Sequence, residues 1–109
     1  MPHLRLRGLQ PALVQKLSET LADELATILE TAPDNFTVEY VPSQFFAKGL
    51  PHEGYPFVEV LWFERAQAVK KKVAERITDC VRSLSKAPDV AVVFRNLPRD
   101  SYFENGKHF

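Results

Sequence analysis

The 109-residue chain has one cysteine, Cys80, and no excess charge of either sign, with 14 basic and 14 acidic residues. One cysteine cannot form a disulfide within the chain. A net charge of zero argues against nucleic acid or an anionic membrane surface as a partner. No apolar run approaches the roughly 20 residues of a membrane helix, so we predict no membrane association. We expect a cytoplasmic protein, because the first residues lack the pattern of a secretion signal.

Patterns typical of metal and cofactor sites are also missing. His3, His52 and His108 are far apart in the chain and have no ligand spacing, so we predict no metal site. The four glycines fall at turns and form no phosphate-binding loop, and we therefore predict no cofactor. Cys80 lies beside the apolar stripe of a predicted helix, with no base at a recognisable spacing. This favours a small buried side chain over a nucleophile.

The chain does contain the same order of predicted elements twice. The first half, about residues 1–50, predicts a strand over residues 3–7, a helix beginning at Pro11, and a strand over residues 36–41. In the second half, about residues 55–109, apolar and β-branched residues predict strands over 55–63 and 90–94. Between them, apolar residues recur at helical spacing from Val69 to Leu84.

Two short sequences mark corresponding points of these halves. Ala-Pro-Asp ends both predicted helices, at residues 32–34 and 87–89. A segment that runs from a proline to a glycine and contains two adjacent aromatic residues ends both halves, at residues 42–49 and 98–106. Repetition at this scale indicates a duplicated supersecondary unit. We therefore predict a single domain over residues 1–109, built from two β-α-β repeats.

Two such units define the expected architecture. Strands joined through a helix pair in parallel with a right-handed crossover, so we predict an α+β (α/β) fold with a four-stranded sheet and two helices on one face. Strands 55–63 and 90–94 are apolar on both sides, which predicts a bare apolar patch on the second face, buried in an oligomer. The first two predicted strands contribute Arg5, Arg7, Thr37 and Glu39 to one face, which indicates paired charges or a polar channel there.

Pro2 opens the first predicted strand. Methionine before proline is normally removed, which would leave Pro2 with a free secondary amine. An α-amino group has a pKa of about 7.7–8.0, and burial or a neighbouring cation lowers that value. Pro2 is thus a candidate general base that moves a proton between carbon and oxygen. The alternative is a proline near the chain start without a chemical role.

The Pro2 start, the two β-α-β units and the segment from Val41 to Gly49, Val-Pro-Ser-Gln-Phe-Phe-Ala-Lys-Gly, together resemble the tautomerase superfamily. The overall shape is similar to the macrophage migration inhibitory factor (MIF) family. The end of the segment is similar to 4-oxalocrotonate tautomerase, abbreviated 4-OT. The resemblance implies a MIF-like fold, a homotrimer whose three sheets enclose a barrel, and an N-terminal proline in a pocket at the subunit boundary. It also implies that no cofactor is used.

The resemblance further implies roles for individual residues. Pro2 matches the catalytic proline of the superfamily, and His3 would lie at the rim of its pocket. Phe63 and Arg65 fall at pocket positions, where the Arg65 fork could hold a substrate carboxylate or enolate oxygen. The other reading of Arg65 is an exposed arginine at a helix start. Tyr102 falls in a C-terminal loop that supplies an aromatic wall in the superfamily.

Several positions depart from the family pattern. Thr31, Ala91 and Val93 stand where MIF carries its lysine, tyrosine and asparagine, and Gln10 stands where 4-OT carries an arginine. The first hypothesis is a cofactor-free tautomerase (an isomerase) acting on a small 2-oxo acid. The second is a non-catalytic trimeric interaction or small-molecule-binding module on the same scaffold, which these departures favour. A ferredoxin-like dimeric binder is a third hypothesis.

Overall fold

The computed structural model describes residues 2–109. Met1, whose removal the first hypothesis requires, lies outside the described residues. The first half of the chain contains two central strands, a long helix, a 3-10 turn and a short hairpin. Their bounds are β1 (His3–Arg7), α1 (Pro11–Leu29), η1 (Pro33–Asn35), β2 (Thr37–Tyr40), β3 (Phe45–Ala47) and β4 (Leu50–His52).

The second half repeats this order, with its 3-10 turn placed after the second central strand. Its elements are β5 (Phe57–Trp62), α2 (Gln67–Ser85), β6 (Ala91–Asn96), η2 (Arg99–Ser101), β7 (Phe103–Glu104) and β8 (Lys107–His108). Each half therefore contains a strand, a 19-residue helix, a second strand and a hairpin.

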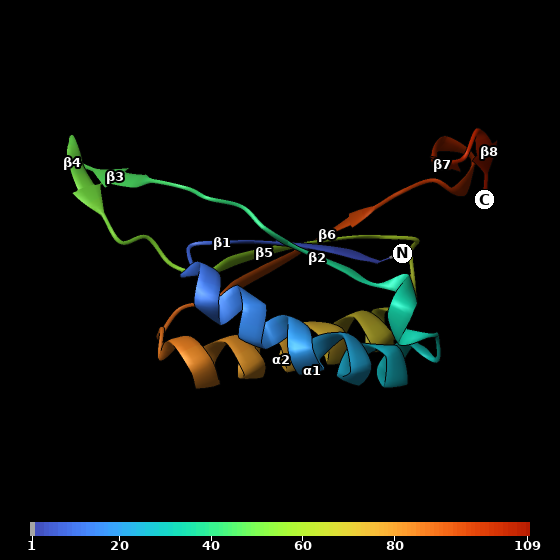
Figure 1. The fold of residues 1–109 in the computed structure, drawn as a ribbon, viewed down its shortest axis with the longest axis horizontal. Helices are drawn as coiled ribbons and strands as arrows, with labels where there is room; N and C mark the ends of the chain where they lie inside the picture. Colours follow the sequence, from blue (N-terminus) through green and yellow to red (C-terminus); the bar gives the residue numbers. More distant parts are fainter. Residues whose placement is uncertain (1) are drawn as a thin grey trace.

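The four central strands form one mixed sheet in the order β2-β1-β5-β6. Each half contributes a parallel pair, β1 with β2 and β5 with β6, and the two pairs meet where β1 runs antiparallel to β5. Both helices lie on the same face of the sheet (Figure 1). The predicted α+β fold class, with four strands and two helices on one face, is confirmed.

The core lies between this sheet and the helices. Buried residues come from alternate positions of β1 and β5, where the period of two turns every second side chain inward. The helices present matching stripes, because positions four apart share one helix face. Three fully or almost fully buried pairs stand at corresponding positions of α1 and α2, 56 residues apart: Leu17 and Val73, Leu21 and Ile77, and Leu25 and Val81.

Both helices end earlier than the Ala-Pro-Asp sequences predicted. Glu30 and Lys86, again 56 residues apart, follow the helices with left-handed φ values of 53° and 61°. A left-handed residue stops the ladder of i to i−4 hydrogen bonds. Pro33 then begins η1 rather than ending α1, since proline is well suited to a first helical turn.

Two hairpins occupy the proline-to-glycine segments at the end of each half, where the sequence analysis predicted no strands. β3 pairs with β4, and β7 pairs with β8, each through a two-residue turn. The turns are Lys48-Gly49 and Asn105-Gly106, and all four residues have positive φ. This is the backbone of the tight turn that matches strand twist. The hairpins project from opposite ends of the molecule, and both described chain ends lie at the β7–β8 end (Figure 1).

The open face of the sheet corrects the prediction of a contiguous apolar patch. An alternating row of charges crosses it: Arg95 Nε lies 3.1 Å from Glu59, Glu59 lies 3.1 Å from Arg5 Nη1, and Arg5 Nε lies 3.2 Å from Glu39. The predicted charge pairing of Arg5 and Glu39 is confirmed. The sheet register brings Glu59 between two arginines. Arg5 on β1 is the direct partner of Glu59, and Arg95 on β6 is the partner of Leu61, which lies two residues after Glu59 on the same side of β5. The row divides the apolar residues contributed by β5 and β6.

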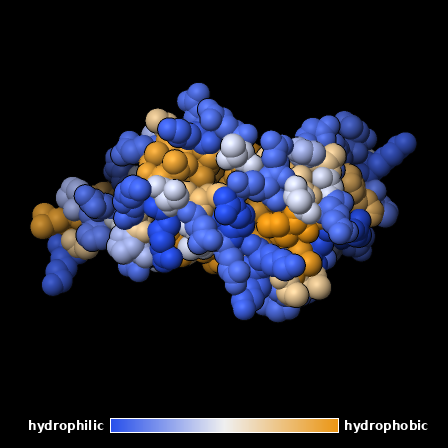
Figure 2. Space-filling view, turned by 90° about the horizontal axis from the view of Figure 1, so that it is seen from below, coloured by the Kyte–Doolittle hydropathy of each residue, from blue (hydrophilic) through white to orange (hydrophobic). Residues whose placement is uncertain are grey.

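The outer face of the helices is mostly hydrophilic, with separate hydrophobic areas (Figure 2). The projecting hairpins make the chain less compact than a sphere-like domain. Its radius of gyration is 14.7 Å, against about 13 Å expected for this length. Within residues 2–109, no helix combines the length and the apolarity that a bilayer crossing requires.

Candidate functional site

Two hollows lie at opposite ends of the sheet. The N-terminal pocket, of about 580 Å³, lies beside the start of β1 and beneath the β7–β8 hairpin. The hairpin groove, of about 940 Å³, lies between the β3–β4 hairpin and the opposite end of the sheet. Three of the predicted site residues, His3, Phe63 and Tyr102, line the N-terminal pocket. None of the predicted site residues lines the hairpin groove.

An aromatic cluster forms one wall of the N-terminal pocket. The rings of Tyr102 and Phe109 each lie 5.5 Å from the Phe63 ring, and 5.1 Å from each other. Phe63 follows the end of β5, and the other two rings come from the chain around the last hairpin. A backbone hydrogen bond of 3.2 Å from Phe109 to Tyr102 closes that segment. The cluster thus gives the pocket an apolar wall that one half of the chain supplies.

Polar and charged side chains occupy the rest of the pocket. Asp34 and Asn35 come from η1, His3 and Thr37 from the first two strands, and Arg99 and Glu104 from the last segment of the chain. Asn35 donates a hydrogen bond of 2.9 Å to Thr31. The pocket therefore joins an apolar wall to a rim that carries both signs of charge.

Pro2 is buried, and its carbonyl oxygen accepts a hydrogen bond of 3.3 Å from the Thr37 amide. Its neighbour in the chain, His3, and the donor of this hydrogen bond, Thr37, both line the N-terminal pocket. Pro2 itself is not among the lining residues. A backbone contact to β2 thus holds Pro2 next to residues that line the pocket.

His3 connects this pocket to the charged row on the open sheet face. Its Nε2 donates to Glu39 at 2.8 Å, because a carboxylate only accepts, and its Nδ1 contacts the Thr37 hydroxyl. The hydrogen bond from His3, opposed by desolvation and aided by the charge of Arg5, lowers the pKa of the Glu39 carboxyl. Both ring nitrogens of His3 are therefore engaged within the protein.

Arg65 and Arg99 differ in what they contact. Arg65 donates from Nη1 to the Leu29 carbonyl oxygen at 3.1 Å and lines neither hollow. It therefore satisfies one of the carbonyls left free at the end of α1. Arg99 lines the N-terminal pocket, with its guanidinium 4.7 Å from the Phe63 ring centre. The sequence analysis missed Arg99, and only its position within the same segment as Tyr102 could have indicated it.

The hairpin groove repeats several features of the N-terminal pocket. Pro56, at the start of β5, is buried and accepts a hydrogen bond of 3.0 Å from the Ala91 amide, as Pro2 accepts one from Thr37. Asp89 lies in the second Ala-Pro-Asp sequence, as Asp34 lies in the first. Phe45 lies 57 residues before Tyr102, at the same place in its hairpin segment. The two hollows therefore occupy corresponding positions of the two halves.

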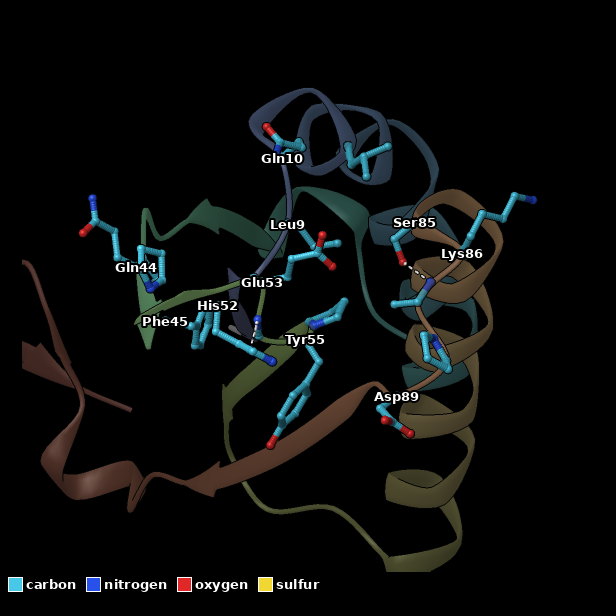
Figure 3. Close-up of a pocket in the computed structure, with 18 of the residues that line it drawn as sticks. Leu9, Gln10, Gln44, Phe45, His52, Glu53, Tyr55, Ser85, Lys86 and Asp89 are labelled. Atoms are coloured by element: carbon cyan, nitrogen blue, oxygen red, sulfur yellow. Dashed lines mark hydrogen bonds between the residues drawn. The ribbon is translucent and has the colours of Figure 1, made fainter. Parts of the chain in front are cut away.

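The side chains of the groove are mixed in character. Figure 3 shows two groups of side chains that face each other across the groove. One group comes from β3–β4 and the connection to β5 and includes Phe45, His52, Glu53 and Tyr55. The other group lies at the end of α2 and includes Ser85 and Lys86. His52 accepts a hydrogen bond of 2.8 Å from the Gly54 amide through Nδ1, which fixes this connection. Gly54 packs so close to Phe45 that a Cβ would lie 2.5 Å from that ring.

Potential reactive and metal-binding groups elsewhere are few. In the part of the chain that the structure describes, no three His, Cys, Asp or Glu side chains form a group that could hold a metal ion. Cys80 lies on α2, where its thiol donates to Glu24 at 3.3 Å. Burial and the hydrogen bond to this carboxylate raise the pKa of the thiol to about 11. The thiol is protonated at neutral pH, which disfavours a nucleophilic role.

A protein-family model matches almost the whole chain. The model described as "Domain of unknown function (DUF1904)" matches residues 1–108. A crystal structure of a DUF1904 domain from Sebaldella termitidis is 39% identical, with a TM-score of 0.95 and all of both chains covered. A protein of unknown function from Vibrio cholerae is 44% identical, with a TM-score of 0.89, covering 99% of this chain and 87% of the other. No curated protein matches at a significant level.

A more distant likeness concerns the fold alone. The structure described as an F6 fused 4-OT wild-type asymmetric trimer has a TM-score of 0.82 at 14% identity. The match covers 97% of this chain and 94% of the fused 4-OT chain. The predicted resemblance to the tautomerase superfamily is confirmed at the level of the fold.

Proposed function

The chain belongs to the DUF1904 family, and from this premise we propose that it is a cofactor-free tautomerase in which Pro2 acts as general base on a small 2-oxo acid. The observation that carries the proposal is the position of Pro2. It is buried at the head of β1, and residues on both sides of it, His3 and Thr37, line the N-terminal pocket. The tautomerase-superfamily fold of the chain supports this assignment.

The proposed chemistry is a proton transfer between carbon and oxygen. The free secondary amine of Pro2 takes a proton from the carbon beside the 2-oxo group, which leaves an enolate and a protonated amine. Delivery of that proton to the enolate oxygen gives the enol and restores the free amine, and the same steps in reverse convert the enol to the 2-oxo acid. His3 would lie at the rim, and Phe63 and Tyr102 would form the dry wall that strengthens electrostatic interactions inside the pocket. The role of Arg65 as a clamp for the enolate oxygen stays a prediction. In the structure, the Arg65 guanidinium donates a hydrogen bond to the Leu29 carbonyl oxygen.

We propose that three copies of the chain assemble, as the structure of fused 4-OT is described as a trimer. The open sheet face supports this assembly, because sheet faces in folds of this kind are normally covered. The faces would enclose a polar interior in which the row of charges from Arg95 to His3 is shielded from solvent. Exposed apolar residues on the two hairpins, Phe46, Leu50 and Phe103, supply additional surface for a neighbouring copy. We also propose a cytoplasmic location, on the sequence argument alone.

One experiment tests the catalytic proposal. The intact mass of the purified protein first establishes whether Met1 has been removed, since Pro2 must have a free amine. Wild type and Pro2→Ala are then compared on a panel of 2-oxo acids and their enols. Tautomerisation by wild type that Pro2→Ala loses supports the proposal. Equal rates for both proteins, with Met1 absent from both, would refute it.

A non-catalytic trimeric binding module on the same scaffold is the second candidate. Two observations favour it: Thr31, Ala91 and Val93 replace residues that act in MIF, and Arg65 is engaged with α1. Such a module would bind a small carboxylic acid without turning it over. The absence of turnover on the whole panel, together with saturable binding of one of its members, would favour this candidate over the first.

A further inference from the structure

Arg99 is the cation of the N-terminal pocket that no carboxylate neutralises. Within residues 2–109 it takes part in no ion pair, whereas Arg5 and Arg95 are each paired with a glutamate. Its side chain is exposed, so a ligand can reach the guanidinium, and that group lies 4.7 Å from the centre of the Phe63 ring. Arginine stacked on an aromatic ring keeps its planar fork of donors free for a carboxylate.

The backbone around Arg99 is anchored to the core. The Leu97 amide donates to the Trp62 carbonyl oxygen at 2.8 Å, and Trp62 is fully buried in β5. Pro98 immediately precedes the single turn η2, which two backbone hydrogen bonds close, from Ser101 to Pro98 and from Tyr102 to Arg99. This arrangement holds Arg99 beside the aromatic cluster before any ligand arrives, which lowers the entropy lost on binding.

The remaining lining residues restrict the ligand further. Asp34 and Glu104 place two carboxylates on the rim, so Arg99 can offset the charge of one carboxylate on a ligand, and a second carboxylate would be repelled. Leu61, Phe63 and Tyr102 offer apolar surface to the rest of the molecule. One free cation, two acids and an apolar wall match an anion with a single carboxylate and an apolar body.

We propose that Arg99 binds the carboxylate of the substrate and that the pocket selects apolar monocarboxylic acids over dicarboxylic acids. This inference rests on the proposed function of the N-terminal pocket. It assigns to Arg99 the clamp that the sequence analysis predicted for Arg65. The guanidinium donates two parallel hydrogen bonds to the carboxylate, while the 2-oxo end of the substrate reaches toward Pro2.

The test of the Arg99 clamp measures ligand binding and not turnover. The clamp proposal can therefore fail or succeed independently of the catalytic proposal. Calorimetry on the full chain would compare 3-phenylpropanoate with its neutral isostere 3-phenylpropanamide. Hydrogen bonds to charged groups predict that the acid binds roughly tenfold to a hundredfold more tightly than the amide. Arg99→Ala should remove this preference, and Arg99→Lys should keep part of it, because lysine retains the charge without the fork.

Two arginines elsewhere sharpen this test. Arg82→Ala is the matched control, because Arg82 donates to the Pro88 carbonyl oxygen at the far end of the sheet and should leave both affinities unchanged. Arg65→Ala tests the competing assignment, in which Arg65 is the carboxylate clamp. Loss of the acid preference in Arg65→Ala, with the preference kept in Arg99→Ala, would overturn the proposal. So would failure of wild type to bind either probe.

A dicarboxylic probe tests the selectivity. Phenylsuccinate should bind roughly tenfold or more weakly than 3-phenylpropanoate, and equal or tighter binding would refute the monocarboxylate preference. The two proposals fail separately. If Pro2→Ala leaves turnover unchanged but Arg99→Ala removes the acid preference, the catalytic proposal is wrong and the clamp stands. If turnover requires Pro2 but the acid preference survives in Arg99→Ala, the clamp is wrong and the catalytic proposal stands.

Discussion

The two β-α-β halves are closely matched in their core, but they differ in what stands at the head of their first strand. Pro2 and Pro56 are both buried, and both accept a backbone hydrogen bond from the strand that pairs in parallel with theirs. The difference is covalent. Removal of Met1 gives Pro2 a free secondary amine, whereas the nitrogen of Pro56 always belongs to a peptide bond.

Under the proposed function, one half of the scaffold holds a reactive amine and the other half holds an unreactive counterpart. The corresponding hollows also differ in charge. Arg99 lies beside the N-terminal pocket, and the residue 57 positions earlier, at the same place before the first hairpin, is Pro42. The N-terminal pocket thus has a free cation in its lining and a candidate base next to its lining residues, and the hairpin groove has neither at the corresponding positions.

The largest expected effect separates the two prolines. In protein whose Met1 has been removed, Pro2→Ala replaces the rigid secondary amine with a mobile primary amine and should lower turnover of a 2-oxo acid by up to roughly 10²- to 10⁴-fold, the usual contribution of a positioned general base. Pro56→Ala should leave turnover within about twofold, because an amide nitrogen cannot act as a base. Steady-state rates of both variants, with intact masses, measure the difference. Equal losses in the two variants would mean that both prolines act through the fold.

The second prediction compares the stability contributions of the two helices at corresponding core positions, where the halves should be equivalent. Leu21→Ala and Ile77→Ala each remove three carbons from a fully buried position of corresponding helices. Each should lower the free energy of unfolding by about 2–5 kcal/mol, with the two values within about 1 kcal/mol of each other. Urea denaturation measures both, and Lys71→Ala on the exposed side of α2 is the control. A much smaller cost for one helix would show that the halves do not share the core equally.

The smallest effect concerns the sheet face, where the halves differ in charge. Glu39 on β2 corresponds to Val93 on β6, 54 residues later, and its pKa is lowered by the hydrogen bond from His3. A carboxyl group whose pKa is lower in the folded than in the unfolded state stabilises the fold at pH values above its unfolded-state pKa of about 4.3. This stabilisation is lost as the pH falls through the folded-state pKa of the carboxyl group. Glu39→Gln should therefore reduce the melting temperature at pH 6–7 by roughly 1–3 °C, and by less at pH 3.

Melting curves across this pH range test the Glu39 expectation. Glu64→Gln is the matched control, since Glu64 is exposed and forms no ion pair within residues 2–109. If the deficit of Glu39→Gln stayed constant down to pH 3, the contact with His3 would not be the cause.

The elements of the fold could be predicted from the sequence because their signals are local. Apolar residues at helical spacing located α1 and α2, and alternation located β1. The repeated Ala-Pro-Asp sequences located the two halves but not the helix ends, which Glu30 and Lys86 set through left-handed backbone. The Asn105-Gly106 turn signal was present and could have indicated the last hairpin.

The charged row and the pocket lining could not be predicted in the same way. The position of Glu59 between Arg5 and Arg95 depends on the register of three strands, which no local pattern specifies. The contact of Arg65 with Leu29 depends on where α1 ends. The stacking of Arg99 on Phe63 joins residues 36 positions apart through the path of the last segment. Each of these contacts depends on tertiary geometry that side-chain type alone leaves open.

Both described chain ends lie at the end of the molecule that holds the N-terminal pocket, and Phe109 is part of its aromatic wall (Figure 1). A purification tag at the amino end would block the proline nitrogen, and one at the carboxyl end would extend directly from that wall. Fluorescent reporters are better attached on the solvent side of α2. Lys71, whose side chain is 76% exposed, offers an attachment point on the opposite layer from the open sheet face.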